Sequence, residues 1–322
     1  MQAASILRDY VVKFSITETI AEPSTAWVKK IGVVVKGGAS DEEGIYECLN
    51  RASISTYTSL TTLSRLFDAG QTSIFIIRVQ TLDKVKDLYK SGRFWTMIFS
   101  EDWLDAEVVN TLEQTGFGDF DGVMAKMFVL SATNQNSYME VARTKENFCC
   151  FATKNTANVN YGNIYYAFGS LLAQEDLDNR QYESMPVDDG INELALAENL
   201  FDKRISFVTT DTDYGTRLSF FAIQDNPIIS PYIDKLLKLD IQAGLVTATN
   251  LYKPNKTISA VKKVEDYIKA NVIDTYINPD VIPTITFKLS LSDDTWFAKG
   301  IVQYPPLQAI WRYKINITKL SS

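Results

Sequence analysis

Thr284–Leu291 reads TITFKLSL and Ile310–Leu320 reads IWRYKINITKL, so apolar and polar residues alternate in both stretches. This period of two is typical of a β-strand with one buried face. The alternating apolar residues are Ile285, Phe287, Leu289 and Leu291 in the first stretch, and Trp311, Tyr313, Ile315 and Ile317 in the second. Because Pro305-Pro306 lies between the stretches, we expect the second strand to leave the body of the protein rather than to fold back in a tight hairpin.

The N-terminal end of the chain shows the same pattern. Tyr10–Thr17 reads YVVKFSIT, which places Val12, Phe14 and Ile16 on one face of a strand, and Pro23 follows. Two terminal strands, each separated from the body of the protein by proline, predict a chain that pairs with copies of itself.

The C-terminal strand is basic, although the chain as a whole is acidic. The net charge is −7 and the pI about 4.9, whereas residues 310–322 contain Arg312, Lys314 and Lys319 and no acidic residue. We therefore expect these three side chains to guide the strand onto an acidic surface, which another copy of the protein would supply. The overall acidity argues against nucleic-acid binding.

The composition is that of a globular protein. Of the 322 residues, 46% are hydrophobic and 22% are charged, which predicts well-formed cores and either two domains or one large domain with an insertion. No apolar stretch approaches the roughly 18 residues that span a bilayer, and the N-terminus lacks the pattern of a secretion signal, so we expect no membrane insertion. The three cysteines fit neither a disulfide framework nor a metal site, and we expect buried thiols.

The first half of the chain alternates predicted strands and helices. Strands are expected at Trp27–Lys36, Ser73–Val79, Arg93–Ser100, Lys126–Leu130 and Asn147–Thr153. Helices are expected at Asp41–Asn50, Thr81–Gly92, Glu101–Gln114 and Tyr161–Ala173. In the last of these helices, glycines would allow close packing. The alternation predicts an α/β layer over residues 73–175. Further along, Pro231–Thr249 and Thr257–Asp274 have the apolar stripe of amphipathic helices.

The sequence offers little for catalysis. It contains no histidine, which excludes a Ser–His or Cys–His nucleophile, and no phosphate-binding glycine loop. Asp119, Asp121, Asp211 and Asp213 superficially resemble calcium loops, but their spacing is not that of an EF-hand, and we interpret them as turn residues. Paired carboxylates could serve a glycosidase, yet nothing selects a pair. We predict no catalytic, cofactor-binding or metal-binding residue, and a protein that is not an enzyme.

The order of these features resembles that of contractile-tail sheath proteins of tailed bacteriophages of the myovirus type. An N-terminal strand-like arm precedes ISTYTSLTTLSRLF (Ile54–Phe67), which leads to SIFIIRV (Ser73–Val79). The C-terminal hundred residues carry the resemblance best. They contain IDKLLKLDIQAGLVTATN (Ile233–Asn250), AVKKVEDYIKANVI (Ala260–Ile273) and the closing WRYKINITK (Trp311–Lys319). The resemblance covers most of the chain.

The resemblance implies a fold with α/β and α+β parts. A C-terminal core domain, with a mixed sheet and flanking helices, would carry an α/β insertion domain and two extended strand-like arms. The expected boundaries are 1–22 for the N-terminal arm, 23–72 for the start of the core domain, 73–205 for the insertion, 206–304 for the C-terminal core domain and 305–322 for the C-terminal arm.

The resemblance also implies a function. Sheath subunits form hexameric rings that stack helically around a tail tube, and the sheath contracts to drive the tube through the host envelope during genome delivery. The implied partners are further copies of the chain, the tail tube protein, and the baseplate and tail terminator proteins, with no cofactor. The implied location is the virion, with assembly in the host cytoplasm.

In such a sheath the terminal arms insert into the sheets of neighbouring subunits. We carry this linking role to Val12, Phe14, Ile16, Trp311, Tyr313, Ile315 and Ile317. Arg312, Lys314 and Lys319 would supply the charges that dock the C-terminal arm.

Two other classes of protein remain open. One is another ring-forming tail component, such as a tube or baseplate protein, although this chain has more predicted helix than a tube protein. The other is a cytosolic α/β enzyme that uses carboxylate chemistry. The sequence does not distinguish a phage tail from another contractile injection machine.

Overall fold

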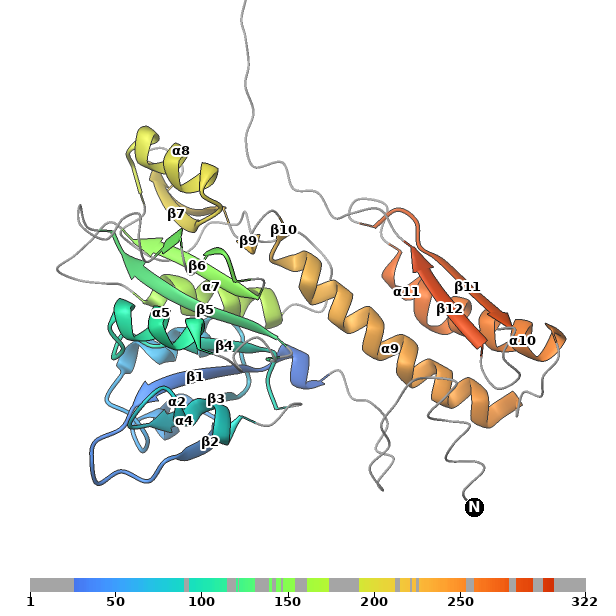
Figure 1. The fold of residues 1–322 in the computed structure, drawn as a ribbon, viewed down its shortest axis with the longest axis horizontal. Helices are drawn as coiled ribbons and strands as arrows, with labels where there is room; N and C mark the ends of the chain where they lie inside the picture. The colour runs from blue at the N-terminus through green and yellow to red at the C-terminus, as the bar shows by residue number, and fades with distance from the viewer. Residues whose placement is uncertain are drawn as a thin grey trace, which may run out of the picture.

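The computed structural model describes residues 26–89, 93–114, 120, 122–130, 139–140, 143–145, 147–153, 161–173, 191–211, 215–220, 222–223, 226–252, 258–277, 282–291 and 298–303. These residues form a large mixed sheet with helices on both faces and a C-terminal unit of helices and one hairpin. Figure 1 shows the long helix α9 running from the sheet to that unit.

The sheet has eight strands in the order β2-β3-β1-β4-β5-β6-β7-β8. They are β1 (Ile31–Lys36), β2 (Gly44–Cys48), β3 (Ile74–Val79), β4 (Thr96–Phe99), β5 (Val123–Val129), β6 (Phe148–Thr153), β7 (Ser206–Asp211) and β8 (Gly215–Phe220). The six strands from β3 to β7 in this order are parallel, and β2 and β8 pair antiparallel at the two edges. The strands are apolar on both faces because helices cover both, which confirms the predicted α/β class.

Helices α3 (Ser64–Asp68) and α7 (Gly162–Ala173) lie on one face of the sheet, where they share a core with α9. The opposite face is covered by α4 (Lys84–Leu88), α5 (Asp105–Glu113) and α8 (Leu194–Asp202). Alternate residues of β1 enter the two cores: Val33 packs in the first and Val34 in the second. Two short helices, α2 (Arg51–Ile54) and η2 (Thr61–Leu63), lead into α3.

The predicted close packing at a glycine of α7 is confirmed at Gly169. A Cβ atom at this position would lie 2.8 Å from the Cβ of Ala69, beyond the end of α3. The Gln71 side-chain amide also donates a hydrogen bond to the Gly169 carbonyl, at 3.0 Å. The missing side chain therefore lets the two helices meet backbone to backbone.

The C-terminal unit begins after two short strands, β9 (Ala222–Ile223) and β10 (Asn226–Pro227). Its elements are α9 (Ile229–Tyr252), α10 (Ile258–Ile268), the π-helical turn η4 (Lys269–Ile273), α11 (Asp274–Tyr276) and the strands β11 (Thr286–Leu291) and β12 (Ala298–Gln303). The amphipathic helices predicted in this region are confirmed: the buried residues of α9 include Ile233, Leu236, Leu237 and Ile241.

The start of α9 is anchored to the large sheet by aromatic contacts. The ring of Tyr232 lies 5.5 Å from that of Trp95, which precedes β4. The ammonium group of Lys235 lies 5.0 Å above the ring of Trp27, in the short helix η1 (Ala26–Lys29). These contacts join α9 to the core of the sheet. No helix in the described ranges is long and apolar enough to cross a membrane.

Two predictions of local structure differ from the structure. The helix expected at Asp41–Asn50 is wrong, because Gly44–Cys48 forms β2 and pairs antiparallel with β3. The strand β12 was not predicted at all, and it forms the hairpin partner of β11 ahead of Pro305-Pro306. In both cases pairing with a neighbouring strand, which no local pattern contains, determines the structure.

The large sheet takes strands from three of the segments that the sequence assigned to different domains. β1 and β2 come from residues before 73, and β7 and β8 come from residues after 205. The division of the chain into domains at those positions stays a prediction.

Candidate functional site

All the residues predicted to link subunits lie outside the described part of the chain. They are Val12, Phe14, Ile16, Trp311, Arg312, Tyr313, Lys314, Ile315, Ile317 and Lys319. Their roles stay predictions. The described residues instead offer three places to look for function: the point where the strand order of the sheet reverses, a buried lysine on β5, and the C-terminal hairpin.

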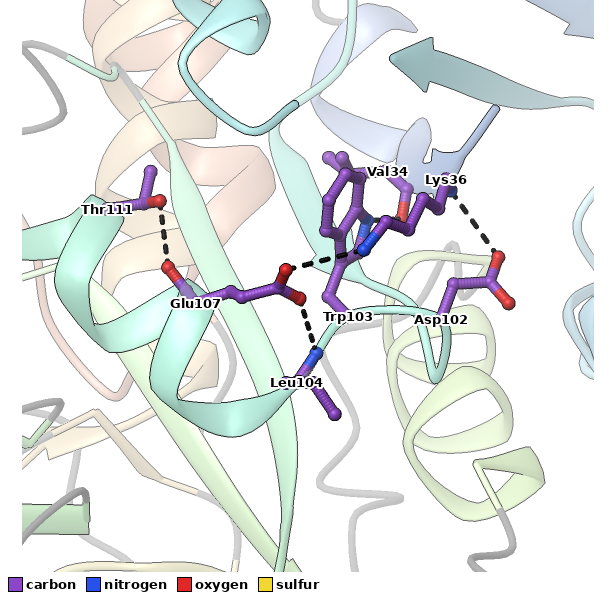
Figure 2. A network of polar contacts seen from close by, with 7 residues as sticks. All are labelled: Val34, Lys36, Asp102, Trp103, Leu104, Glu107 and Thr111. Atoms are coloured by element: carbon purple, nitrogen blue, oxygen red, sulfur yellow. Dashed lines mark hydrogen bonds and ion pairs between the residues drawn. The ribbon is translucent and has the colours of Figure 1, made fainter. Parts of the chain in front are cut away.

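In an open parallel sheet, ligands bind beyond the carboxyl ends of the strands, where the strand order reverses. That point lies here between β1 and β4, because the chain proceeds from β1 to one side of the sheet and then returns to the other. The residues after β4 contact β1 at this point. Trp103 is 3% exposed, and its indole N–H donates a hydrogen bond of 3.1 Å to the carbonyl of Val34 in β1 (Figure 2).

Charged side chains make further contacts at the same place. Lys36, at the end of β1, places its ammonium group 4.9 Å above the Trp103 ring and 3.3 Å from the carboxylate of Glu107. The other Glu107 oxygen accepts the backbone N–H of Leu104 at 2.9 Å, so the same side chain caps α5 (Figure 2). The backbone N–H of Lys36 donates to Asp102 at 3.4 Å, while burial raises the pKa of Asp102.

These contacts hold β1, the residues after β4 and α5 together, and they use the polar groups that a ligand would need. The Trp103 indole donates to the backbone of β1, the lysine is paired, and both carboxylates accept hydrogen bonds from backbone N–H groups of the protein itself. A carboxyl group with a raised pKa can act as a general acid only beside a reacting group. Here its neighbours join β1 to the start of α5.

A second polar network surrounds Lys126, a lysine of β5 that is 1% exposed. Its ammonium group lies 3.3 Å from Asp105 of α5, donates to the Met127 carbonyl at 3.0 Å and contacts the Tyr161 hydroxyl beside α7. The Tyr161 hydroxyl in turn donates to the Met127 carbonyl at 2.7 Å. Burial lowers the pKa of Lys126, and the charge of Asp105 opposes that change. The network joins a helix on each face to the centre of the sheet.

Glu101 extends this network toward α3. It accepts a hydrogen bond from the Tyr165 hydroxyl at 2.7 Å and a second one from the Thr62 hydroxyl. Burial raises the pKa of Tyr165 well above its usual value, and the neighbouring Glu101 raises it further. The sequence showed this lysine only as the first residue of the predicted strand KMFVL, and its partners lie far apart along the chain.

The third place is the hairpin of β11 and β12, which pair antiparallel from Thr286↔Gln303 to Leu291↔Ala298. Phe287 is buried against the core, whereas Thr286, Lys288 and Ser290 are exposed, as the alternation in the sequence predicted. Within the described residues this sheet has only two strands, so each strand has an outer edge. A sheet edge is the structure to which an extended segment of another chain can add.

Charged groups of α10 lie against β11. The Glu265 side chain is 8% exposed, and its carboxylate binds Lys262 at 2.9 Å and Lys269 at 2.8 Å. Its second oxygen accepts the backbone N–H of Leu289 at 2.7 Å. Burial favours the neutral acid, but the hydrogen bonds from Lys269, Lys262 and Leu289 prevail and lower the pKa of Glu265 to about 2. Glu265 is therefore ionised at neutral pH.

The described residues contain no group of three or more side chains that could hold a metal ion. The three thiols, of Cys48, Cys149 and Cys150, are buried and unpaired with one another. Burial raises the pKa of Cys149 to about 12, so its reactive thiolate is scarce at neutral pH.

Comparison with solved structures finds the helical sheath of the anti-feeding prophage (AFP), determined by cryo-electron microscopy in the contracted state. The TM-score is 0.59 at 11% sequence identity, over 96% of this chain and 99% of that one. No family model matches the sequence, and no curated protein matches it. The likeness therefore concerns the fold, and it extends over nearly the whole of both chains. This chain has the fold of a contractile helical sheath protein.

Proposed function

We propose that the chain is the subunit of a contractile tail sheath. One observation carries this proposal: the fold of a contracted helical sheath covers 96% of the chain, so the correspondence extends beyond the α/β sheet to the C-terminal unit. The contacts of Trp103 and Lys36 add support, because they lie at the usual ligand position of such a sheet, beyond the ends of β1 and β4, and join parts of the chain to one another.

In this proposal, subunits form hexameric rings that stack helically around a tail tube. The sheath contracts and drives the tube through the host envelope during genome delivery. Its partners are other copies of the chain, the tube protein, and the baseplate and terminator proteins at the two ends. The subunit has a structural role rather than an enzymatic one, and it belongs to the virion after assembly in the host cytoplasm.

Strand exchange would connect the subunits. The alternating segments around Val12–Ile16 and Trp311–Ile317 would each add to a sheet of a neighbouring copy. The hairpin of β11 and β12 supports this view, because it is a small sheet with outer edges in the region of the fold nearest to the C-terminal segment in sequence. Such links keep subunits connected while their rigid bodies reorient.

Electron microscopy of the purified full chain at high concentration tests the proposal. A sheath subunit forms wide, striated hollow tubes, alone or after addition of the tail tube. A tube protein would form narrow tubes, and an enzyme would form small closed oligomers. Small particles only, both with and without the tail tube, would refute the sheath assignment.

A truncation tests the role of the C-terminal segment separately. Deleting residues 311–322 removes the predicted linking strand and leaves every described residue in place. We expect a folded protein with an unchanged thermal transition that does not polymerise. Normal tubes from this variant would show that the segment does not link the subunits.

A further inference from the structure

Lys126 of β5 and Asp105 of α5 hold an amine and a carboxyl group against each other inside the protein. The Lys126 Nζ lies 3.3 Å from the Asp105 Oδ1, and the two side chains are 1% and 15% exposed. Two aromatic rings flank the ammonium group, that of Tyr161 at 4.7 Å from Nζ and that of Phe128 at 6.0 Å. The two polar groups therefore contact each other in a place from which water is largely excluded.

Both side chains are attached to regular elements, so the fold itself brings them together. Asp105 is the first residue of α5, and Lys126 lies within β5, which is paired with β4 on one side and with β6 on the other. The second carboxylate oxygen is also held, because the backbone N–H of Val129 donates to the Asp105 Oδ2 at 3.4 Å. One oxygen thus faces the amine, and the other faces a backbone donor.

This arrangement favours a reaction between the two groups. Reacting groups that are held in place behave as if their concentration were roughly 10⁵–10⁸ M, far above that of water in solution. Condensation to an amide also removes two charges from the interior, where charges are costly to bury. Burial lowers the pKa of Lys126 and so favours the neutral, nucleophilic amine, although the charges of Asp105 and Glu101 oppose that change.

We propose that Lys126 and Asp105 condense to a side-chain amide, which joins β5 to α5 covalently. A chain that has not yet reacted keeps the ion pair, and the reacted chain is lighter by one water molecule. Both groups belong to one folded subunit, so the reaction does not depend on assembly or on the proposed sheath function. It adds a self-modification site to a protein whose proposed role is structural.

The contacts assign a role to each atom. A proton passes from Nζ to Oδ1, which leaves a neutral amine beside a neutral acid. The nitrogen lone pair attacks Cγ of Asp105, and negative charge develops on Oδ2, where the N–H of Val129 stabilises it. A second proton passes from the nitrogen to Oδ1 through the Tyr161 hydroxyl, which contacts Nζ, and Oδ1 leaves as water. Oδ2 remains as the amide oxygen.

Mass spectrometry of the purified full chain, denatured for the measurement, tests the reaction. We expect the folded chain to become lighter by one water molecule during incubation, and chain kept in denaturant to keep its mass. Trypsin should fail to cleave after Lys126, because it does not recognise an acylated lysine, so residues 94–143 should be recovered as one peptide that lacks a water. An unchanged mass and complete cleavage after Lys126, following a week of incubation of the folded chain, would overturn the proposal.

The digest also separates the amide from other losses of water. An aspartate that forms a cyclic imide with its own backbone loses one water too, but it leaves the bond after Lys126 cleavable, and that result would refute the amide. Lys262 and Asp266 provide an internal control, because their charged atoms lie 2.8 Å apart while both side chains are more than half exposed. No peptide that contains this pair should lack a water, and an equal loss there would refute the argument from enclosure.

Substitutions separate the chemistry from the fold. Lys126→Arg and Asp105→Ala each remove one reacting group, and neither chain should lose water from residues 94–143; a loss from either would refute the amide. Tyr161→Phe keeps both groups and removes the proton relay, so we expect the loss of water to slow by roughly tenfold or more. Tyr165→Phe is the matched control, because that hydroxyl binds Glu101 instead of Lys126, and its rate should equal that of the unaltered chain. Equal rates in the two tyrosine variants would refute the relay.

Discussion

Lys126 shows how a single buried charge can organise a sheet. Its ammonium group is almost fully enclosed and has Asp105, the Met127 carbonyl and Tyr161 as neighbours. Burying a charge is costly, and a partner of opposite charge repays the cost only when the geometry is good. Lys126 is therefore a position where the loss of one partner should matter more than the loss of the whole pair.

Asp105→Asn should destabilise the protein by about 3 kcal/mol at neutral pH, because it leaves the Lys126 charge buried without a counter-charge. The pKa of Lys126 is lowered in the folded state, so the unfolded state binds more protons between the folded and unfolded pKa values. Stability should accordingly rise with pH through that window, more steeply in the variant. Denaturant unfolding across alkaline pH measures both effects. The double variant Asp105→Asn/Lys126→Met is the control, because it removes the buried charge as well as its partner. If it is destabilised as much as Asp105→Asn, the unpaired charge of Lys126 is not the cause of the destabilisation.

Glu265 gives a prediction for acidic pH. Its folded pKa of about 2 lies below the ordinary value of 4.5, so its contribution to stability is complete above pH 4.5 and is lost as the pH falls toward 2. Ionised Glu265 should contribute about 1–3 kcal/mol to the free energy of unfolding. Solvent screens its ion pair with Lys262, which is partly exposed, and this lowers the contribution. Glu265→Gln should flatten the dependence of unfolding free energy on pH between 4.5 and 2. An equally steep dependence in the variant would assign the effect to other carboxylates.

At the scale of elements, the helices on the sheet are placed by close contacts as well as by apolar area. Gly169 of α7 meets Ala69 and the backbone of Leu66 at the end of α3. In the C-terminal unit, Gly244 of α9 faces Ile268 and Val272 with similarly little space. Both glycines lie inside helices, where their intrinsic preference is unfavourable, so packing explains their presence.

Gly169→Ala should destabilise the protein by about 1–3 kcal/mol, although alanine is the better helix former. The added Cβ would lie 2.8 Å from the Ala69 Cβ, and neither atom belongs to a side chain that can rotate away. Thermal or denaturant unfolding measures the change. The double variant Gly169→Ala/Ala69→Gly should regain most of the stability that Gly169→Ala loses. If the effects of the two substitutions on the free energy of unfolding simply add, the contact between residues 169 and 69 is not the cause.

At the scale of the whole molecule, charge is distributed unevenly along the chain. The net charge is −7, yet residues 310–322 carry three positive side chains and no negative one. If that segment docks on another copy, the attraction between the basic segment and the acidic body promotes assembly. Attraction between exposed charges is screened by salt over about 8–10 Å at ionic strengths of 0.10–0.15 M.

Tube formation should therefore weaken as salt is raised, with a critical concentration that increases between 50 and 500 mM salt. The double change Arg312→Glu/Lys314→Glu should raise the critical concentration for tube formation further. It should also remove the dependence of that concentration on salt. Light scattering at several ionic strengths measures both, and Lys29→Glu/Lys203→Glu offers a control with the same change in net charge within the described body. Equal effects of the two double changes would show that net charge alone controls assembly.

Local pattern alone predicts much of the fold. Ser73–Val79 and Asn147–Thr153 were predicted as strands and form β3 and β6, because a continuous apolar run bounded by turn residues fits a strand covered on both faces. The helix at Glu101–Gln114 was also predicted, and the structure places α5 at Asp105–Glu113. The hydrogen bond between Glu265 and Leu289 could not be predicted in this way, since the two residues are 24 positions apart.

The sequence by itself determined the α/β class, most strands of the large sheet and both long C-terminal helices, because the periods of two and 3.6 residues are properties of neighbouring residues. Only the tertiary structure decided that Gly44–Cys48 is a strand, that β12 completes the hairpin, and that Lys126 and Glu265 are enclosed by partners. These features depend on pairing and burial between distant segments, whose free energies exceed the local preferences of the residues involved.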